Sequence, residues 1–295
     1  MRPFQYITTR SLAEAESALA GYGSHVSVLA GGTDLLVEWR RPAGSSPEVV
    51  VDISRISELQ GIGVNDGMIT VRPLVTHKET MISPVIRKSA PLLAAAAAGI
   101  GSPQIRNRGT VGGNIMNAAT CADMVPPLIA LGATVTLESR SGKRDMALVD
   151  LFVKPYETRA RNDEVLTEVR FAGLSSGMRS AFIKLGRRNA LSISRLSVAT
   201  ILEQNDEGKI VDARIVPGAA FPVWQRVRKA EEALLGEKPT ARLFAAAGKI
   251  VSEEMVARTG RRWSTEYKEP VIAVLVRRAL AQCARPENVR REAGE

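Results

Sequence analysis

The chain has 295 residues, of which 45% are hydrophobic and 24% charged, and its formal net charge is +9. It contains no run of about 18 apolar residues, so we expect no membrane span. Two histidines and two cysteines in unrelated contexts, Cys121 and Cys283, exclude a disulfide framework, a zinc site and an iron–sulfur cluster held by this chain alone. Aromatic residues make up only 4%, too few for base stacking, so the positive charge favours an anionic cofactor or an acidic partner over nucleic acid.

The first 60 residues predict a small α/β unit. Ser11 and Glu14 match a capping box, which predicts a helix that stops at Gly21. Residues 26–30 are typical of a short buried strand, and a glycine-rich turn, a helical stretch and a strand at 49–53 follow. This order of elements makes parallel strands plausible.

Residues 61–176 predict a larger, mixed subdomain. Residues 62–71 match a hairpin with an Asn-Asp-Gly turn, and the alanine-rich residues 92–98 predict a buried helix. After a second glycine-rich turn, Asp123 stands where a helix N-cap is expected, with two prolines in the first turn and Gly132 at the end. The pattern therefore alternates strands with short helices.

The small, polar residues 173–177 are the best candidate domain boundary. Beyond them we expect two strands and then two amphipathic helices, at residues 197–204, 209–216, 243–257 and 271–283. The sequence thus predicts an α+β protein with an N-terminal domain over 1–176, divided at residue 60, and a C-terminal domain over 177–295.

Two glycine-rich motifs carry the strongest functional signal. They are Ala30-Gly31-Gly32-Thr33-Asp34, the first glycine motif, and Thr110-Val111-Gly112-Gly113-Asn114, the second glycine motif. Paired glycines let a ligand approach the backbone closely, and successive N–H groups in such turns bind anions. Neither motif matches a P-loop, a Rossmann fingerprint or a kinase glycine loop. They indicate a ligand with two phosphates, or one long phosphorylated cofactor held from two sides.

Several stretches resemble those of one protein family. Residues 28–35 and 104–115 are similar to the two flavin-binding motifs in the FAD subunits of the molybdenum hydroxylases, which include xanthine dehydrogenase and carbon monoxide dehydrogenase. Residues 122–128 resemble the helix start that follows the second motif, and residues 184–188 and 259–264 resemble parts of the C-terminal domain. The resemblance is collinear over nearly the whole chain.

The resemblance implies a two-subdomain FAD-binding region of the vanillyl-alcohol-oxidase type, followed by a smaller domain of antiparallel sheet and helices. It implies an oxidoreductase subunit with a large molybdopterin-binding partner and a small partner that carries [2Fe–2S] clusters, arranged as a dimer of heterotrimers. Electrons would pass from molybdenum through the clusters to FAD and then to an external acceptor. A cytoplasmic location is expected, because the N-terminus lacks an apolar signal core.

The family's cofactor-binding positions carry over to particular residues of this chain. Backbone N–H groups of the first glycine motif would hold the pyrophosphate, the second motif would approach from the other side, and Asp123 would accept hydrogen bonds from cofactor hydroxyls. A cation at Lys184 would stabilise negative charge on the reduced flavin, and no residue is expected to act as an acid or base catalyst. The full predicted set is Val28, Leu29, Ala30, Gly31, Gly32, Thr33, Asp34, Leu35, Ile100, Thr110, Val111, Gly112, Gly113, Asn114, Asn117, Asp123, Leu166 and Lys184.

Two other functions stay open at this point. One is a free-standing FAD oxidoreductase of the vanillyl-alcohol-oxidase fold, which would need its own substrate pocket and active-site base. The other is a binding or assembly protein that has lost flavin. Ser192 stands where many relatives have an acid, in a region that meets NAD in some members, and this counts against NAD as the acceptor. His77 and Cys121 are expected to be structural.

Overall fold

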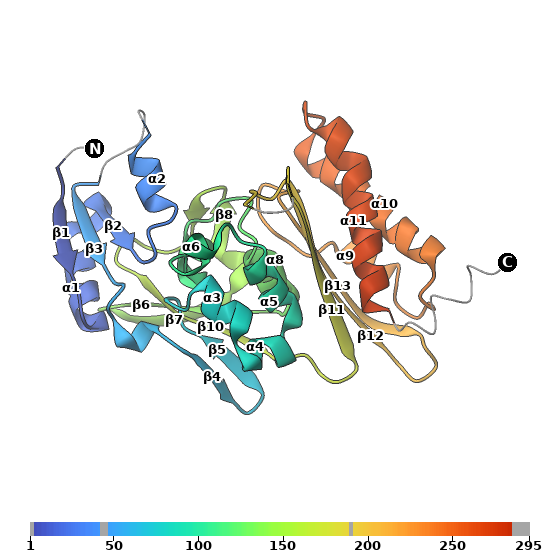
Figure 1. The fold of residues 1–295 in the computed structure, drawn as a ribbon, viewed down its shortest axis with the longest axis horizontal. Helices are drawn as coiled ribbons and strands as arrows, with labels where there is room; N and C mark the ends of the chain where they lie inside the picture. Colours follow the sequence, from blue (N-terminus) through green and yellow to red (C-terminus); the bar gives the residue numbers. More distant parts are fainter. Residues whose placement is uncertain (1–2, 42–46, 189–190, 285–295) are drawn as a thin grey trace.

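The structure, a computed structural model, describes residues 3–41, 47–188 and 191–284. Within these ranges three sheets follow one another along the long axis of the molecule in chain order (Figure 1). Each sheet has its own cluster of buried apolar side chains. The predicted α+β class is confirmed.

The N-terminal sheet is parallel, as the order of elements suggested. It consists of β1 (Gln5–Thr8), β3 (Val49–Asp52) and β2 (Val26–Leu29), in that order across the sheet. The helix α1 (Leu12–Tyr22) covers the buried strand β3 with its apolar face. Strand β2 is only partly buried, contrary to expectation, because Val28 lines a pocket instead of the core.

The ends of α1 show how closely local sequence sets local structure. The Ser11 hydroxyl accepts the backbone N–H of Glu14 at 3.3 Å, which is one half of the predicted capping box. The other half differs, because the Glu14 carboxylate accepts the N–H of Arg10 at 2.7 Å and not that of Ser11. The helix runs to Tyr22, past the expected stop at Gly21, because Gly23 and not Gly21 adopts a left-handed backbone (φ +57°).

The middle sheet has five antiparallel strands in the order β4-β5-β10-β6-β7. Asp66 and Gly67 both have positive φ in the turn between β4 and β5, which confirms the predicted hairpin. The strands, with a separate two-stranded pair, are β4 (Ile62–Asn65), β5 (Met68–Val71), β6 (Thr134–Ser139), β7 (Gly142–Ala147), β10 (Val165–Ala172), and the pair β8 (Phe152–Lys154) and β9 (Glu157–Thr158).

Short helices accompany the first two sheets. The alanine-rich helix α5 buries Leu92, Leu93, Ala94, Ala96 and Ala97, and its small side chains allow close packing on that face, whereas Pro91, Ala95 and Ala98 are exposed. The helices are α2 (Leu35–Trp39), α3 (His77–Ile82), α4 (Pro84–Ser89), α5 (Pro91–Ala98), α6 (Pro103–Arg106), α7 (Val111–Met116) and α8 (Val125–Ala130), with 3₁₀ turns at Gly23–His25, Ser57–Leu59 and Leu148–Leu151.

The C-terminal sheet lies between two layers of helices (Figure 1). It comprises β11 (Met178–Leu185), β12 (Leu196–Gln204) and β13 (Ile210–Gly218), all antiparallel. On one face lie α10 (Ala241–Thr259) and α11 (Thr265–Cys283), and the short α9 (Arg228–Glu232) contacts β13. Helices α5 and α8 of the middle region contact the same sheet from the other side. The two strands and two helices predicted here are confirmed, with α11 starting earlier than expected.

The alternation of side chains along β12 explains why this strand is buried on both faces. Ala199 and Ile201 belong to the middle core, whereas Val198 and Leu202 belong to the core under α10 and α11. The strand therefore joins two cores, and the C-terminal sheet is packed firmly against the middle region.

Residues 173–177 connect β10 to β11 without a helix or strand. The division into domains over 1–176 and 177–295 stays a prediction, and its outermost residues lie outside the described ranges.

Candidate functional site

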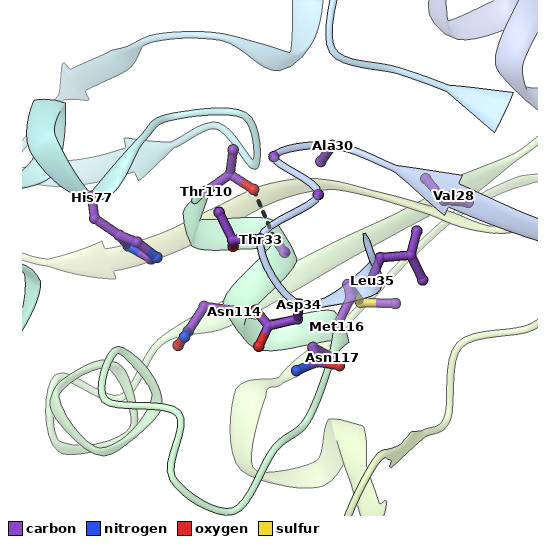
Figure 2. A pocket seen from close by; sticks show the side chains of 13 residues that line it. Val28, Ala30, Thr33, Asp34, Leu35, His77, Thr110, Asn114, Met116 and Asn117 are labelled. Atoms are coloured by element: carbon purple, nitrogen blue, oxygen red, sulfur yellow. Dashed lines mark hydrogen bonds between the residues drawn. The ribbon is translucent and has the colours of Figure 1, made fainter. Parts of the chain in front are cut away.

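A pocket of about 300 Å³ lies where the two glycine motifs meet (Figure 2). One wall comes from the end of β2 and the start of α2, and the opposite wall from α7 and the first residue of α3. The carboxyl end of a parallel strand is a common place for a ligand in α/β sheets. The lining residues are Val28, Ala30, Gly31, Gly32, Thr33, Asp34, Leu35, His77, Thr110, Gly113, Asn114, Met116 and Asn117.

The first glycine motif presents free hydrogen-bond donors to this pocket. Gly32 has a left-handed backbone (φ +73°), which turns the chain sharply between β2 and α2. In the described part of the chain, no hydrogen bond engages the backbone N–H groups of residues 31–34. Successive unpaired N–H groups in a turn form a concavity that suits an anion. Ligand binding by this motif stays a prediction.

Gly31 is needed for a different reason from the one expected. A Cβ atom at this position would lie 2.1 Å from the carbonyl oxygen of Arg108 and 3.1 Å from the Cα of Gly109. The first glycine motif is therefore in backbone contact with the segment just before the second motif. Glycine at position 31 lets the two walls of the pocket approach each other.

The second glycine motif is a helix start and not an open turn, which corrects the sequence-based expectation. Thr110 is the N-cap of α7, and its two glycines lie in the first helical turn. All four N–H groups of residues 111–114 are already paired inside the protein. Their acceptors, in chain order, are the carbonyl oxygens of Val75 and Pro73, the Thr110 hydroxyl and the Thr110 carbonyl oxygen, at 2.8–3.0 Å.

The two motifs are consequently not equivalent. The second motif offers the side chains of Thr110 and Asn114 to a ligand in place of backbone N–H groups (Figure 2). The Thr110 hydroxyl accepts the N–H of Gly113 and can still donate its own hydrogen into the pocket. Asn114 Oδ1 accepts the N–H of Met124 at 3.2 Å, which leaves its NH₂ group for a ligand. Unpaired backbone N–H groups for an anion therefore come from the first glycine motif alone, and not from the second.

Removing the Thr110 cap tests this description of α7. We expect Thr110→Val to lower the free energy of unfolding by about 1 kcal/mol, the typical cost of a lost N-cap, because the N–H of Gly113 loses its acceptor. Thr110→Ser keeps the hydroxyl and should stay close to wild type. Urea denaturation of the three proteins measures the difference, and a valine variant as stable as wild type would contradict the assigned cap.

The pocket lining has little formal charge. Asp34 is the only ionisable acid in it, and partial burial raises the pKa of its carboxyl group. No lysine or arginine lines the pocket, and the imidazole of His77 is neutral because burial, helped by Arg106, lowers its pKa to about 4. An anionic ligand here would be held by neutral dipoles and not by an ion pair.

A second pocket of about 180 Å³ continues the first. Ala30, Gly31 and Thr110 line both pockets, so the two share a wall at the contact between the motifs. The second pocket adds polar side chains that include Asn107 and Arg108. The two pockets are therefore adjacent, one beside the other at this contact.

Asp123 lies in a separate buried cluster and is only 4% exposed. Its carboxylate accepts hydrogen bonds from Lys184 Nζ at 2.7 Å and from the Ser194 hydroxyl at 2.5 Å. Burial raises the pKa of Asp123, and Lys184 and then Ser194 oppose that shift. The predicted N-cap role is wrong: Met124 is the N-cap of α8, because the Asp123 carboxylate is turned toward the C-terminal sheet.

The Asp123 cluster lies near the main pocket. Lys184 Nζ also donates to the carbonyl oxygen of Gly99 at 2.8 Å, next to the predicted residue Ile100. The pKa of Cys121 is raised by burial, by the carboxylate of Asp123 and, to a smaller extent, by that of Asp34 in the pocket. Ile100, Asp123 and Lys184 are thus brought together, although they do not line the pocket itself.

The remaining predicted residues pack around the pocket walls. Leu29, Val111 and Gly112 support the two motifs from behind, and Gly112 fits only as glycine because a Cβ would lie 2.5 Å from Pro73. Leu166 on β10 is 3% exposed and belongs to the middle core. Two lining residues, His77 and Met116, were not predicted as ligands. The capping box at Thr76 can be read from the sequence and marks the start of a helix. The sequence does not show that the first residue of this helix, His77, faces the two glycine motifs.

The donor set of the pocket fits a phosphorylated cofactor. It combines unpaired N–H groups of the first motif, a hydroxyl, an amide and a neutral imidazole whose buried Nδ1 has no partner. Buried polar groups are nearly always paired, so an orphaned one beside a pocket marks a place for a ligand atom.

Two known protein families match this chain, one over each part. The family described as the FAD binding domain in molybdopterin dehydrogenase matches residues 2–171. The CO dehydrogenase flavoprotein C-terminal domain matches residues 181–283. The chain is therefore built as a flavoprotein subunit of an oxidoreductase.

Individual relatives agree with the family match. The FAD-subunit of nicotinate dehydrogenase from Eubacterium barkeri is 34% identical over 278 residues, 91% of this chain and 92% of the relative. The medium chain of carbon monoxide dehydrogenase from Hydrogenophaga pseudoflava is 30% identical over 285 residues, 95% and 98% of the two chains. A solved structure of carbon monoxide dehydrogenase from that organism superimposes with a TM-score of 0.89 at 30% identity, covering 96% of this chain and 100% of the other. The protein belongs to the family of FAD-binding flavoprotein subunits of the molybdopterin dehydrogenases.

No helix among the described residues is long and apolar enough to cross a membrane. No group of three or more His, Cys, Asp or Glu side chains among the same residues is placed to hold a metal ion.

Proposed function

We propose that this chain holds FAD in the adjacent pockets at the two glycine motifs and relays electrons from partner subunits to an external acceptor. The unpaired N–H groups of residues 31–34 are the observation that carries the proposal, because they form a cradle for the cofactor pyrophosphate. The two adjoining pockets supply the length that a dinucleotide needs. FAD supplies the redox chemistry, and the chain binds and orients it.

The predicted residues divide between three roles in this proposal. The first glycine motif holds the pyrophosphate, and Thr110 and Asn114 add side-chain donors from the facing helix. Ile100, Asp123 and Lys184 shape the site next to Gly99, where the Lys184 ammonium would favour the anionic reduced flavin. Leu29, Val111, Gly112 and Leu166 support the site through packing.

The proposed assembly contains a large molybdopterin-binding subunit and a small subunit with [2Fe–2S] clusters, as a dimer of heterotrimers. Its support is that relatives of nearly the same length are named as the FAD-subunit or medium chain of dehydrogenases. We also propose a cytoplasmic location, in keeping with the two free thiols Cys121 and Cys283.

A free-standing FAD oxidoreductase is the alternative that the pocket argues against. Such an enzyme needs an acid or base poised to move a substrate proton. In the pocket lining, Asp34 is the only carboxylate, and His77 is neutral and buried at 3% exposure. This set suits cofactor binding better than proton transfer.

Purification of the native complex tests the proposed function. We expect a flavin spectrum with superimposed [2Fe–2S] bands, one FAD for each copy of this chain, and molybdenum by metal analysis. A lone yellow protein that oxidises a substrate unaided would support the free-standing enzyme. A complex without flavin that does not bind added FAD would contradict the proposal.

A further inference from the structure

His77 is a buried histidine whose side chain no sequence pattern assigned to the site. It is the first residue of α3, is 3% exposed and lines the main pocket opposite the first glycine motif. In Figure 2 its imidazole extends from α3 toward Thr33 and Thr110. Its backbone N–H donates to the carbonyl oxygen of Gly109 at 3.0 Å, so only the ring is left to interact with a ligand.

The backbone of Gly109 fixes one edge of the His77 imidazole ring. A Cβ atom on Gly109 would lie 3.0 Å from His77 Cδ2 and 3.1 Å from Nε2, so the ring packs directly on that glycine. An isolated bridge between Thr76 and Thr110 ties the two backbones together beside it. The imidazole is therefore held in place before any ligand binds.

On the opposite edge of the imidazole ring, the Nδ1 atom lacks a hydrogen-bond partner among the described residues. Nδ1 is buried and has no hydrogen-bond partner within the described chain. Leaving a buried polar atom unpaired costs about 1–3 kcal/mol. The neutral ring carries one N–H donor, and the free N–H groups of the first glycine motif line the same pocket.

We propose that His77 is a cofactor-binding residue whose Nδ1–H donates a hydrogen bond to a phosphoryl oxygen of FAD. This inference rests on the proposed function and adds a residue to it. The ring supplies, from the α7 side, the donor that the paired N–H groups of the second glycine motif do not provide. Gly109 keeps the ring in position, so the donor is prepared for the ligand.

Four substitutions test the proposal in the purified complex, after removal and titration of FAD. His77→Phe keeps the ring shape without a donor and should raise the Kd for FAD at least tenfold, or about 1.4 kcal/mol. His77→Asn places its amide where Nδ1 stands and should stay within about threefold of wild type, whereas His77→Gln mimics Nε2 and should not rescue binding. His77→Asp has the shape of Asn but repels phosphate, so it should bind FAD at least tenfold more weakly than Asn.

His25→Asn is the matched control, because the His25 side chain is 63% exposed, lies beside Glu48 and does not line the pocket. Its Kd should not change, and circular dichroism of each variant checks the fold. Unchanged binding in His77→Phe would overturn the inference, as would rescue by Gln and not Asn. Equal Kd values for the Asp and Asn variants would overturn the assignment to a phosphoryl oxygen. A wild-type complex that takes up no FAD would instead contradict the proposed function itself.

Discussion

Gly31→Ala is expected to weaken FAD binding by about 100-fold, which corresponds to roughly 2.7 kcal/mol. The added Cβ would lie 2.1 Å from the Arg108 carbonyl oxygen and 2.9 Å from its carbon, and backbone atoms cannot move aside as the end of a side chain can. Overpacking of this kind typically costs about 1–3 kcal/mol and here separates the two walls of the pocket. Titration of the flavin-depleted complex with FAD measures the change.

Gly21→Ala is the control for this prediction. Gly21 lies within α1, where a Cβ atom would have nothing within 4 Å, so alanine should leave FAD binding unchanged and slightly stabilise the helix. If Gly31→Ala folds and binds FAD as wild type does, the contact between the two motifs does not shape the site.

Lys184→Met is expected to lower the free energy of unfolding by about 3 kcal/mol at neutral pH, since it leaves the buried Asp123 carboxylate without its cation. The Ser194 hydroxyl remains as a partner but brings no charge. Because Lys184 is on β11 and Asp123 precedes α8, the loss also loosens the packing of the C-terminal sheet on the middle region. Urea denaturation of the purified chain gives the value.

The pH dependence of this variant follows from the direction of the shift. Burial raises the pKa of Asp123, and Lys184 is the main group that opposes this, so the variant's carboxyl should bind a proton more readily in the folded state. A raised carboxyl pKa makes the folded state more stable as the pH falls through that pKa. The difference from wild type should therefore shrink on acidification below neutral pH.

Lys249→Met is the matched control, because Lys249 is 78% exposed and its partner Glu253 lies one helical turn away. Exposed pairs of this type contribute about 0–1 kcal/mol. Asp123→Asn combined with Lys184→Met should recover part of the lost stability, since no buried charge is left unpaired. A difference from wild type that grows on acidification would contradict the assigned pairing.

The contrast between the glycine motifs shows what sequence reasoning can and cannot assign. Both motifs have adjacent glycines, and their order along the chain was enough to indicate the family. Yet residues 31–34 leave their N–H groups free, whereas residues 111–114 use all of theirs in and beside α7. A glycine pair allows close approach in both cases, but only the fold decides whether a ligand or another part of the backbone approaches.

Local patterns fixed most of the elements. The Ser11 N-cap and the Asn-Asp-Gly hairpin form as predicted, because their hydrogen bonds and backbone angles depend on residues only a few positions apart. Asp123 was misassigned because a carboxylate before two prolines looks like an N-cap, while its real partner is 61 residues away.

By itself, the sequence determined the α+β class, the succession of strands and helices, and the family of flavoprotein subunits, since periodicity and ordered motifs are properties of neighbouring residues. Only the tertiary structure decided that Gly31 packs on Arg108, that Asp123 pairs with Lys184 of the C-terminal sheet, and that His77 lines the same pocket as the first glycine motif. These are contacts between segments far apart in the chain, and their geometry depends on the packing of whole sheets and helices.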